Sequence, residues 1–162
     1  MAVKPRPSYL GFDKPSYAWK AGIDYRVQPE LYRVGKGEQG VLICEPYKTE
    51  ILPHWRFADA KLAKASAEAI HKLFYAYLKR REFVGADMAR KFLQMGFTRA
   101  RRYANYAGGR KYDKDNNYAL RKRGTGDPGK AESAAIFYEH WQEAEAEPRY
   151  AALKADWKTR FG

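Results

Sequence analysis

The chain has 162 residues, a formal net charge of +12 and 45% hydrophobic residues. This composition suffices for one folded domain with its own core and excludes a compositionally disordered chain. No apolar run approaches the roughly 18 residues that a membrane helix needs, and residues 1–20 lack the apolar stretch of a secretory signal. A single cysteine, Cys44, excludes an intrachain disulfide. We therefore expect a soluble cytoplasmic protein with no membrane partner.

The N-terminal part of the chain predicts extended structure. Residues 1–22 are rich in proline, lysine and aromatics without a period, which predicts an extended N-terminal arm. Residues 23–162 show no compositional boundary and are expected to form a single globular domain. Within it, the apolar stretches 31–34 and 41–44 flank the glycine-rich loop 35–40, and this pattern predicts a β-hairpin. The loop has the letters of a dinucleotide motif, but no helix pattern follows it, so a dinucleotide site is not indicated.

The remainder of the chain has the periodicity and the capping signals of helices. Asp59 is placed to cap a helix that runs to Lys79. Further helices are predicted over 87–95, over 98–107, from Pro128 toward Pro148, and from Pro148 toward the C-terminus. The predicted fold class is therefore α+β and mainly helical, with about five helices and a small N-terminal β-hairpin or sheet.

Residues 87–107 also match the outline of a helix-turn-helix. Met95-Gly96-Phe97 lies between two short helical patterns, and a central glycine suits the turn of such a unit. Gly96 would then take the left-handed position that ends the first helix. This pattern is shared by many helical pairs that do not read DNA, so it supports DNA binding only weakly.

The positive charge is concentrated in one segment. Residues 79–130 carry 15 Lys and Arg against five Asp and Glu, whereas residues 131–162 are net acidic. Such concentration indicates a surface for an anionic partner. A solvated helix face is the simpler interpretation of the same residues.

Three arginines within this segment indicate a phosphate-binding site. Arg99, Arg101 and Arg102 would lie in the first turn of the predicted helix 98–107, where cations oppose the partial positive charge of the helix N-terminus. A bound phosphate would relieve this cost, because it pairs with guanidinium groups and with free backbone N–H groups. Tyr103 is expected in the core, whereas Tyr106 is expected on the basic face.

A basic loop over 108–129 continues the pattern, with tyrosines that could stack on bases. The sequence therefore predicts a nucleic-acid-binding protein, with DNA and RNA both open as partners. The candidate nucleic-acid-binding residues are Arg90, Lys91, Arg99, Arg101, Arg102, Tyr106, Arg110, Lys111, Tyr112, Arg121, Lys122 and Arg123.

Two alternatives remain open. The first is an enzyme acting on a phosphorylated or nucleic-acid substrate, with a pocket between the loop 35–40, the triplet His54-Trp55-Arg56 and the arginine helix. The second is an interaction module that docks on an acidic protein or a ribonucleoprotein. Either would use the same basic residues.

No catalytic, metal-binding or cofactor-binding residue is identified. His54, His71 and His140 are widely separated and show no metal-ligand spacing. Cys44 lies in an apolar stretch, which is typical of a small buried hydrophobic residue and not of a nucleophile. We therefore expect neither a metal nor a cofactor.

Three long stretches carry a family resemblance: Pro29 to Val41, Glu45 to Phe57 and, most strongly, Phe83 to Asn105. Through them the chain resembles the domain-of-unknown-function family four-three-eight-five, seen in bacteria and phages. The resemblance extends from about Asp24 to the C-terminus. It implies a small intracellular protein and carries over no activity and no catalytic residue.

Overall fold

A computed structural model of the chain describes residues 17–106, 112–113, 119–120 and 126–162. In chain order its elements are the 3-10 helix η3 (Pro29–Leu31), α1 (Tyr47–Ile51), the 3-10 helix η4 (Leu52–His54), α2 (Ala60–Lys79), α3 (Phe83–Asn105), β1 (Tyr112–Asp113), β2 (Ala119–Leu120), α4 (Lys130–Ala146) and α5 (Pro148–Phe161). Most of the predicted arm and of the predicted basic loop lies outside the described residues.

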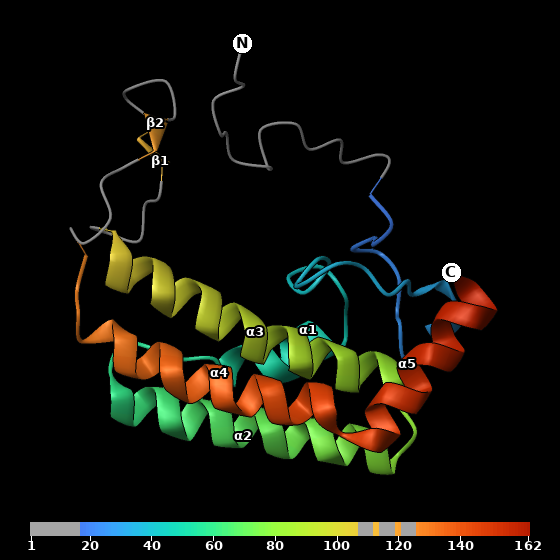
Figure 1. Ribbon diagram of the computed structural model, residues 1–162. Coiled ribbons are helices and arrows are strands. Elements are labelled where there is room, and N and C mark those ends of the chain that lie inside the picture. Colours follow the sequence, from blue (N-terminus) through green and yellow to red (C-terminus); the bar gives the residue numbers. More distant parts are fainter. Residues whose placement is uncertain (1–16, 107–111, 114–118, 121–125) are drawn as a thin grey trace.

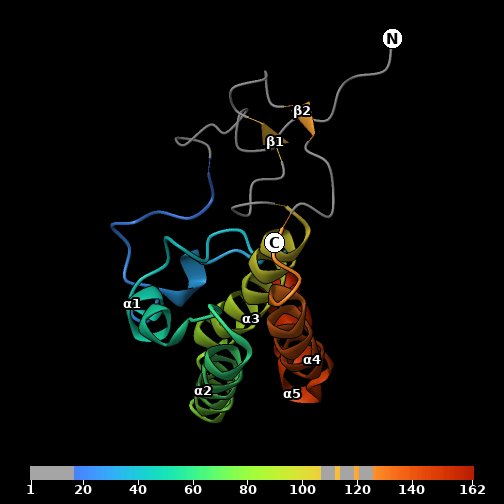
Figure 2. The same ribbon diagram turned by 90° about the vertical axis from the view of Figure 1, so that its left-hand side faces the viewer.

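The long helices α2, α3 and α4 run side by side, and α5 turns away from the end of α4 (Figure 1). The short helix α1 and the irregular segment that precedes it lie on the side of α3 away from α4 (Figure 2). Helix α3 thus packs against α1, α2, α4 and α5. It is the centre of the fold.

Helix α2 forms as its sequence pattern predicts. The carboxylate of Asp59 accepts a hydrogen bond of 2.8 Å from the backbone N–H of Leu62, which caps the first turn. The buried face repeats every three or four residues. Its apolar members are Ala63, Ala67, Ile70, Phe74, Tyr77 and Leu78.

The predicted α+β class with an N-terminal hairpin is wrong. Between residues 17 and 106 the structure contains no strand, only an isolated bridge between Asp24 and Glu45. The N–H groups of Val41 and Cys44 donate to Glu38 and Gly40, so consecutive turns satisfy the backbone that a ladder would have used. Among the described residues, only the two-residue strands β1 and β2 pair, in antiparallel register.

The predicted helix-turn-helix is also wrong, because α3 continues unbroken through Met95, Gly96 and Phe97. A side-chain Cβ built at Gly96 would lie 2.4 Å from the ring of Phe137 on α4. The absence of a side chain at Gly96 therefore serves the close approach of two helices and not a turn. The two predicted helices are one helix, and the short helix α1 was not predicted.

We expect Gly96→Ala to lower the free energy of unfolding by about 1–3 kcal/mol, because the added methyl group overlaps the ring of Phe137. At an exposed helix position the same change would stabilise the protein by about 1 kcal/mol. Urea unfolding of the single variants and of Gly96→Ala combined with Phe137→Leu measures the effect. The cost of the alanine should shrink in the Phe137→Leu background, and a stabilising Gly96→Ala would contradict the close contact.

Candidate nucleic-acid interface

The basic residues of α3 divide into a buried pair and an outer cluster. Arg90 and Lys91 are 2% and 0% exposed, although the sequence assigned both to a phosphate-binding surface. They have no exposed surface to offer a polyanion. Their positive charge is instead used inside the protein.

The partner of both cations is Asp87, which is completely buried. Its Oδ1 accepts hydrogen bonds from Arg90 Nη2 at 2.9 Å and from the hydroxyl of Tyr150 at 2.6 Å. Its Oδ2 accepts from the hydroxyl of Tyr32 and lies 3.5 Å from Lys91 Nζ. Buried charges persist in proteins when they are paired and hydrogen-bonded in this way.

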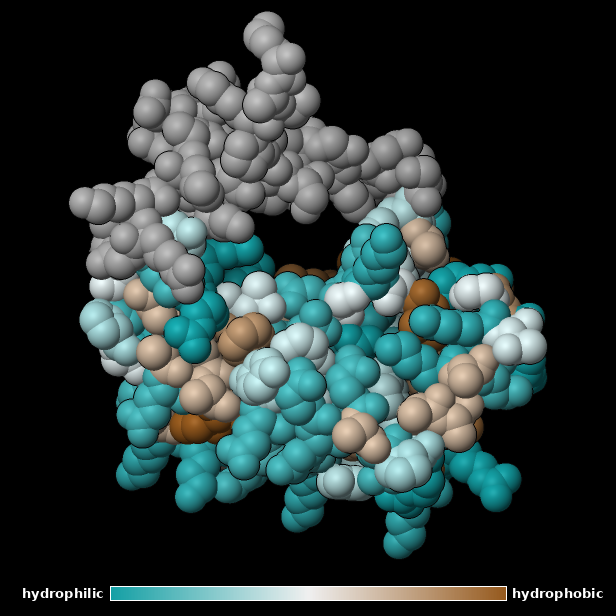
Figure 3. Space-filling model, in the orientation of Figure 1, coloured by the Kyte–Doolittle hydropathy of each residue, from teal (hydrophilic) through white to brown (hydrophobic). Residues whose placement is uncertain are grey.

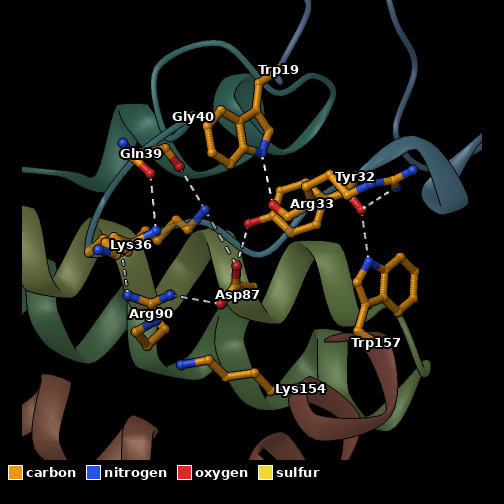
Figure 4. Close-up of polar contacts among 12 residues, drawn as sticks. Trp19, Tyr32, Arg33, Lys36, Gln39, Gly40, Asp87, Arg90, Lys154 and Trp157 are labelled. Carbon is orange, nitrogen blue, oxygen red and sulfur yellow. Dashed lines mark hydrogen bonds and ion pairs between the residues drawn. The ribbon is translucent and has the colours of Figure 1, made fainter. Parts of the chain in front are cut away.

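Further hydrogen bonds from the two cations hold the N-terminal segment against α3 (Figure 4). Arg90 Nη1 donates to the carbonyl of Gly37 at 2.7 Å, and Lys91 Nζ donates to the carbonyl of Gln39 at 2.6 Å. The ammonium of Lys91 also lies 5.1 Å from the ring centre of Trp19. The loop 35–40 is therefore docked on α3 by two buried cations.

The indole of Trp19 packs against the docked loop 35–40. Its Nε1 donates to the carbonyl of Arg33 at 3.0 Å, and its ring covers Gly35 and Gly40. A Cβ at either glycine would lie within 2.8 Å of the indole, and Gly40 has a φ of +82°. The absence of a side chain at both glycines leaves room for the indole ring. At Gly40 it also allows the left-handed backbone conformation.

Opposing effects set the pKa of Asp87. Burial acts to raise it, but the charges of Arg90 and Lys91 and the hydroxyl hydrogen bonds outweigh burial and hold the pKa below its ordinary value. Burial and the Asp87 charge raise the pKa of Tyr32 well above its usual range. At neutral pH the Asp87 carboxylate is therefore ionised, and the Tyr32 hydroxyl keeps its proton and donates it in a hydrogen bond.

We expect Asp87→Asn to lower the free energy of unfolding by about 3–5 kcal/mol, because two buried cations lose their counter-charge. Denaturant unfolding at pH 7 measures the loss. The matched control is Asp156→Asn, which removes an exposed carboxylate 3.4 Å from Arg160 and should change stability by less than about 1 kcal/mol. Equal effects of the two substitutions would contradict the buried network.

The pH dependence follows from the lowered pKa of Asp87. Its stabilising contribution is present above the unfolded pKa of about 3.8 and is lost as the pH falls toward the lower folded value. The difference in unfolding free energy between the wild type and Asp87→Asn should therefore shrink below about pH 5. A difference that stays constant from pH 7 to pH 3 would refute this assignment.

The outer cluster consists of Arg99, Arg101 and Arg102, and we call it the arginine cluster. It lies in the last two turns of α3, which ends at Asn105. Arg99 is exposed and the other two are half-buried. Among the described residues, no carboxylate lies within 4.0 Å of these guanidinium groups.

The arginine cluster does not carry the electrostatic cost that was predicted from the sequence, and that prediction is wrong. Because α3 begins at Phe83, the arginines lie near its C-terminus and not in a first turn. Cations near a helix C-terminus are favoured by the helix dipole. No bound phosphate is needed to explain their position.

One carboxylate lies near the cluster. Thr98 Oγ1 donates to Glu38 Oε2 at 3.2 Å, and Glu38 lies close enough to Arg99 and Arg102 for their charges to affect it. Burial raises the pKa of Glu38, and the Thr98 hydrogen bond and the two arginines oppose that shift. The negative charge of ionised Glu38 therefore opposes the positive charges of Arg99 and Arg102.

Glu38 and Arg99 also line a pocket of about 180 Å³. The triplet His54-Trp55-Arg56 does not line this pocket. The ring of Trp55 packs instead against Phe92 and Phe57, with ring centres 6.1 Å and 5.0 Å apart. Of the three features in the predicted enzyme pocket, the structure thus brings together only the loop and Arg99. Among the described residues, the pocket is lined by Tyr17, Glu38, Gly40, Val41, Leu42, Ile43, Met95 and Arg99.

Aromatic side chains flank the arginine cluster. Tyr103 is 37% exposed, contrary to its predicted place in the core, and its ring lies 5.9 Å from Phe57. Tyr106 is half-buried just beyond the end of α3. Tyr112 belongs to β1, and its backbone pairs with Leu120. The predicted ligands Arg110, Lys111, Arg121, Lys122 and Arg123 lie outside the described residues.

Two features escaped the sequence analysis for different reasons. The spacing of Asp87, Arg90 and Lys91 at i, i+3 and i+4 is a signal for ion pairs within a helix and could have been used. The meeting of His71 and His140, whose nearest nitrogens are 2.8 Å apart, has no sequence signal because 69 positions separate them.

The fold and the site define a small helical protein with a buried ionic core and a cluster of arginines at one helix end, which have no carboxylate within ion-pair distance among the described residues. Residues 17–160 match the profile of the family described as a domain of unknown function (DUF4385), so the chain belongs to that family, as its motifs predicted. No curated protein and no solved structure matches it. Within the described ranges, none of the helices is long and apolar enough to span a membrane.

Proposed function

We propose that the protein binds nucleic acid and that the arginine cluster holds the phosphates. The observation that carries the proposal is that Arg99, Arg101 and Arg102 have no carboxylate within ion-pair distance among the described residues. Guanidinium groups match phosphate geometry with two parallel hydrogen bonds. Three of them within four residues suit a chain of phosphates better than a single small anion.

The neighbouring aromatic rings support a nucleic-acid ligand over other polyanions. Tyr103 exposes part of its ring beside Phe57, one residue beyond the cluster. Exposed aromatic rings next to cations are typical of surfaces on which unpaired bases stack. In the sequence, the cluster is followed closely by the basic residues of 107–125, which add to the positive charge of this part of the chain.

An enzyme pocket at Glu38 is less well supported. A carboxylate with a raised pKa beside an arginine is typical of functional sites. The pocket of about 180 Å³ is, however, smaller than the roughly 300–1,000 Å³ of most small-molecule sites. None of the lining residues that the structure describes is a serine, cysteine, histidine or lysine. The extended surface therefore remains the proposal.

The proposal is tested by replacing Arg99, Arg101 and Arg102 together with alanine. Affinity for labelled duplex DNA, single-stranded DNA and structured RNA should fall on the order of 100-fold at low salt, because phosphate contacts are lost. On duplex DNA the slope of log K against log salt should decrease by about 0.9 for each lost contact. Fluorescence anisotropy over a salt series measures both quantities.

The matched control removes the same charge from another helix, by replacing Lys61, Lys64 and Lys72 with alanine. These lysines are exposed on α2, which lies on the side of α3 away from β1 and β2 in both ribbon views (Figures 1 and 2). This variant should keep most of the affinity. Equal losses in the two triple variants would mean non-specific attraction, and no binding by the wild type at low salt would overturn the proposal.

Glu38→Gln provides a test in the opposite direction. Removing this negative charge leaves Arg99 and Arg102 unopposed, so phosphate affinity should increase, by up to about fivefold at low salt. The increase should disappear in the variant that lacks the three arginines. Weaker binding by Glu38→Gln, with the fold intact by circular dichroism, would indicate instead that Glu38 itself contacts the ligand.

A further inference from the structure

A second polar cluster lies between α2 and α4. His71 on α2 and His140 on α4 direct their Nδ1 atoms at each other across 2.8 Å. Oε2 of Glu143 lies 3.8 Å from Nδ1 of His71. The ligand atoms of all three side chains fall within 4.8 Å of one another.

The helices hold these side chains in place. His140 and Glu143 are three residues apart on α4, so they share one face of that helix. The imidazole of His71 is 5% exposed and stacks on the ring of Tyr75, with centres 4.9 Å apart and planes 6° apart. The site is therefore built from one fixed buried ligand and two ligands nearer the surface.

The 2.8 Å between the two Nδ1 atoms is a hydrogen-bond distance, and it also brings two nitrogens that can each ligate a cation to one point. A hydrogen bond between the two rings uses one lone pair, whereas one cation between them would use both Nδ1 lone pairs. In a tetrahedral zinc site with bonds of about 2.0–2.2 Å, neighbouring ligand atoms lie roughly 3.3–3.6 Å apart. The observed separations of 2.8 and 3.8 Å lie on either side of that spacing.

The orientation of His71 adds a second observation. Its Nε2 is buried without a hydrogen-bond partner in the described part of the chain. The contacts of this buried ring with His140 and Glu143 are both made at its Nδ1 atom.

We propose that His71, His140 and Glu143 bind a divalent transition-metal ion of the zinc class. Two imidazole nitrogens and one carboxylate oxygen suit Zn²⁺, whereas Ca²⁺ and Mg²⁺ prefer oxygen ligands throughout. Three protein ligands leave a fourth tetrahedral position for water. The ion would join α2 to α4 and is independent of nucleic-acid binding by the arginine cluster.

The test uses the full chain without a histidine tag, stripped of metal by a chelator. Calorimetric titration should show one Zn²⁺ bound per chain, and Co²⁺ should give the visible absorption of a tetrahedral site. At a Zn²⁺ concentration about 100 times Kd, the melting temperature should rise by roughly 5–10 °C. No saturable binding of Zn²⁺ at micromolar concentration overturns the proposal.

Variants locate the site. His140→Ala should weaken Zn²⁺ binding by about 100-fold or more, and Glu143→Gln by about tenfold, because each removes one ligand. The side chain of Glu143 is 58% exposed, so Glu143→Gln should fold normally. It therefore still tests the site if His140→Ala fails to fold. His54→Ala is the control, because His54 is exposed and lies outside the cluster. Unchanged affinity in Glu143→Gln and His140→Ala, or equal loss in His54→Ala, overturns the assignment.

Discussion

The carboxylate of Asp87 joins three parts of the chain that are far apart in the sequence. It accepts hydrogen bonds from Tyr32 in the N-terminal segment, from Arg90 on α3 and from Tyr150 on α5. Removing these groups from water costs several kcal/mol for each charge, and pairing recovers that cost only when the geometry is satisfied throughout. Such a network stabilises one arrangement over others, because an alternative packing would leave a buried charge without its partner.

The position of the arginine cluster depends on this network. Asp87, Arg90 and Lys91 fix the first half of α3 in the core and dock the loop 35–40 against it. The last two turns of the same helix then extend to the surface with three arginines. The face seen in Figure 3 is mainly hydrophilic, with apolar residues in small groups, which does not favour a large apolar docking surface there.

Much of the helical content and the family were predictable from the sequence, because caps and periodicity are local signals. Asp59 and the face of α2 gave one helix with its correct start and end. The errors arose where a residue's role depends on a distant partner. Gly96 has the sequence signature of a turn, but its missing side chain makes room for Phe137 on another helix. Gly35 and Gly40 likewise make room for Trp19.

Dependence on distant partners also explains why the sequence did not indicate which basic residues of the candidate site are buried. Arg90 and Lys91 are basic residues in a basic segment, and their burial depends on Asp87 together with carbonyls about 50 positions earlier in the chain. The convergence of His71 and His140 likewise follows from the packing of α2 on α4 and not from spacing. Arg99, Arg101 and Arg102 lie together near the end of α3, but the electrostatic reason for which they were selected is removed by the length of that helix.

Binding of nucleic acid at the end of α3 can be measured by mapping backbone amide NMR shifts as an oligonucleotide is added to the full chain. Changes should concentrate at residues 98–106, around the arginine cluster, and should weaken as salt is raised, because phosphate contacts release counterions. The exposed face of α2 should remain unchanged. Shifts centred on α2, or no shifts at low salt, would contradict binding of nucleic acid by the end of α3.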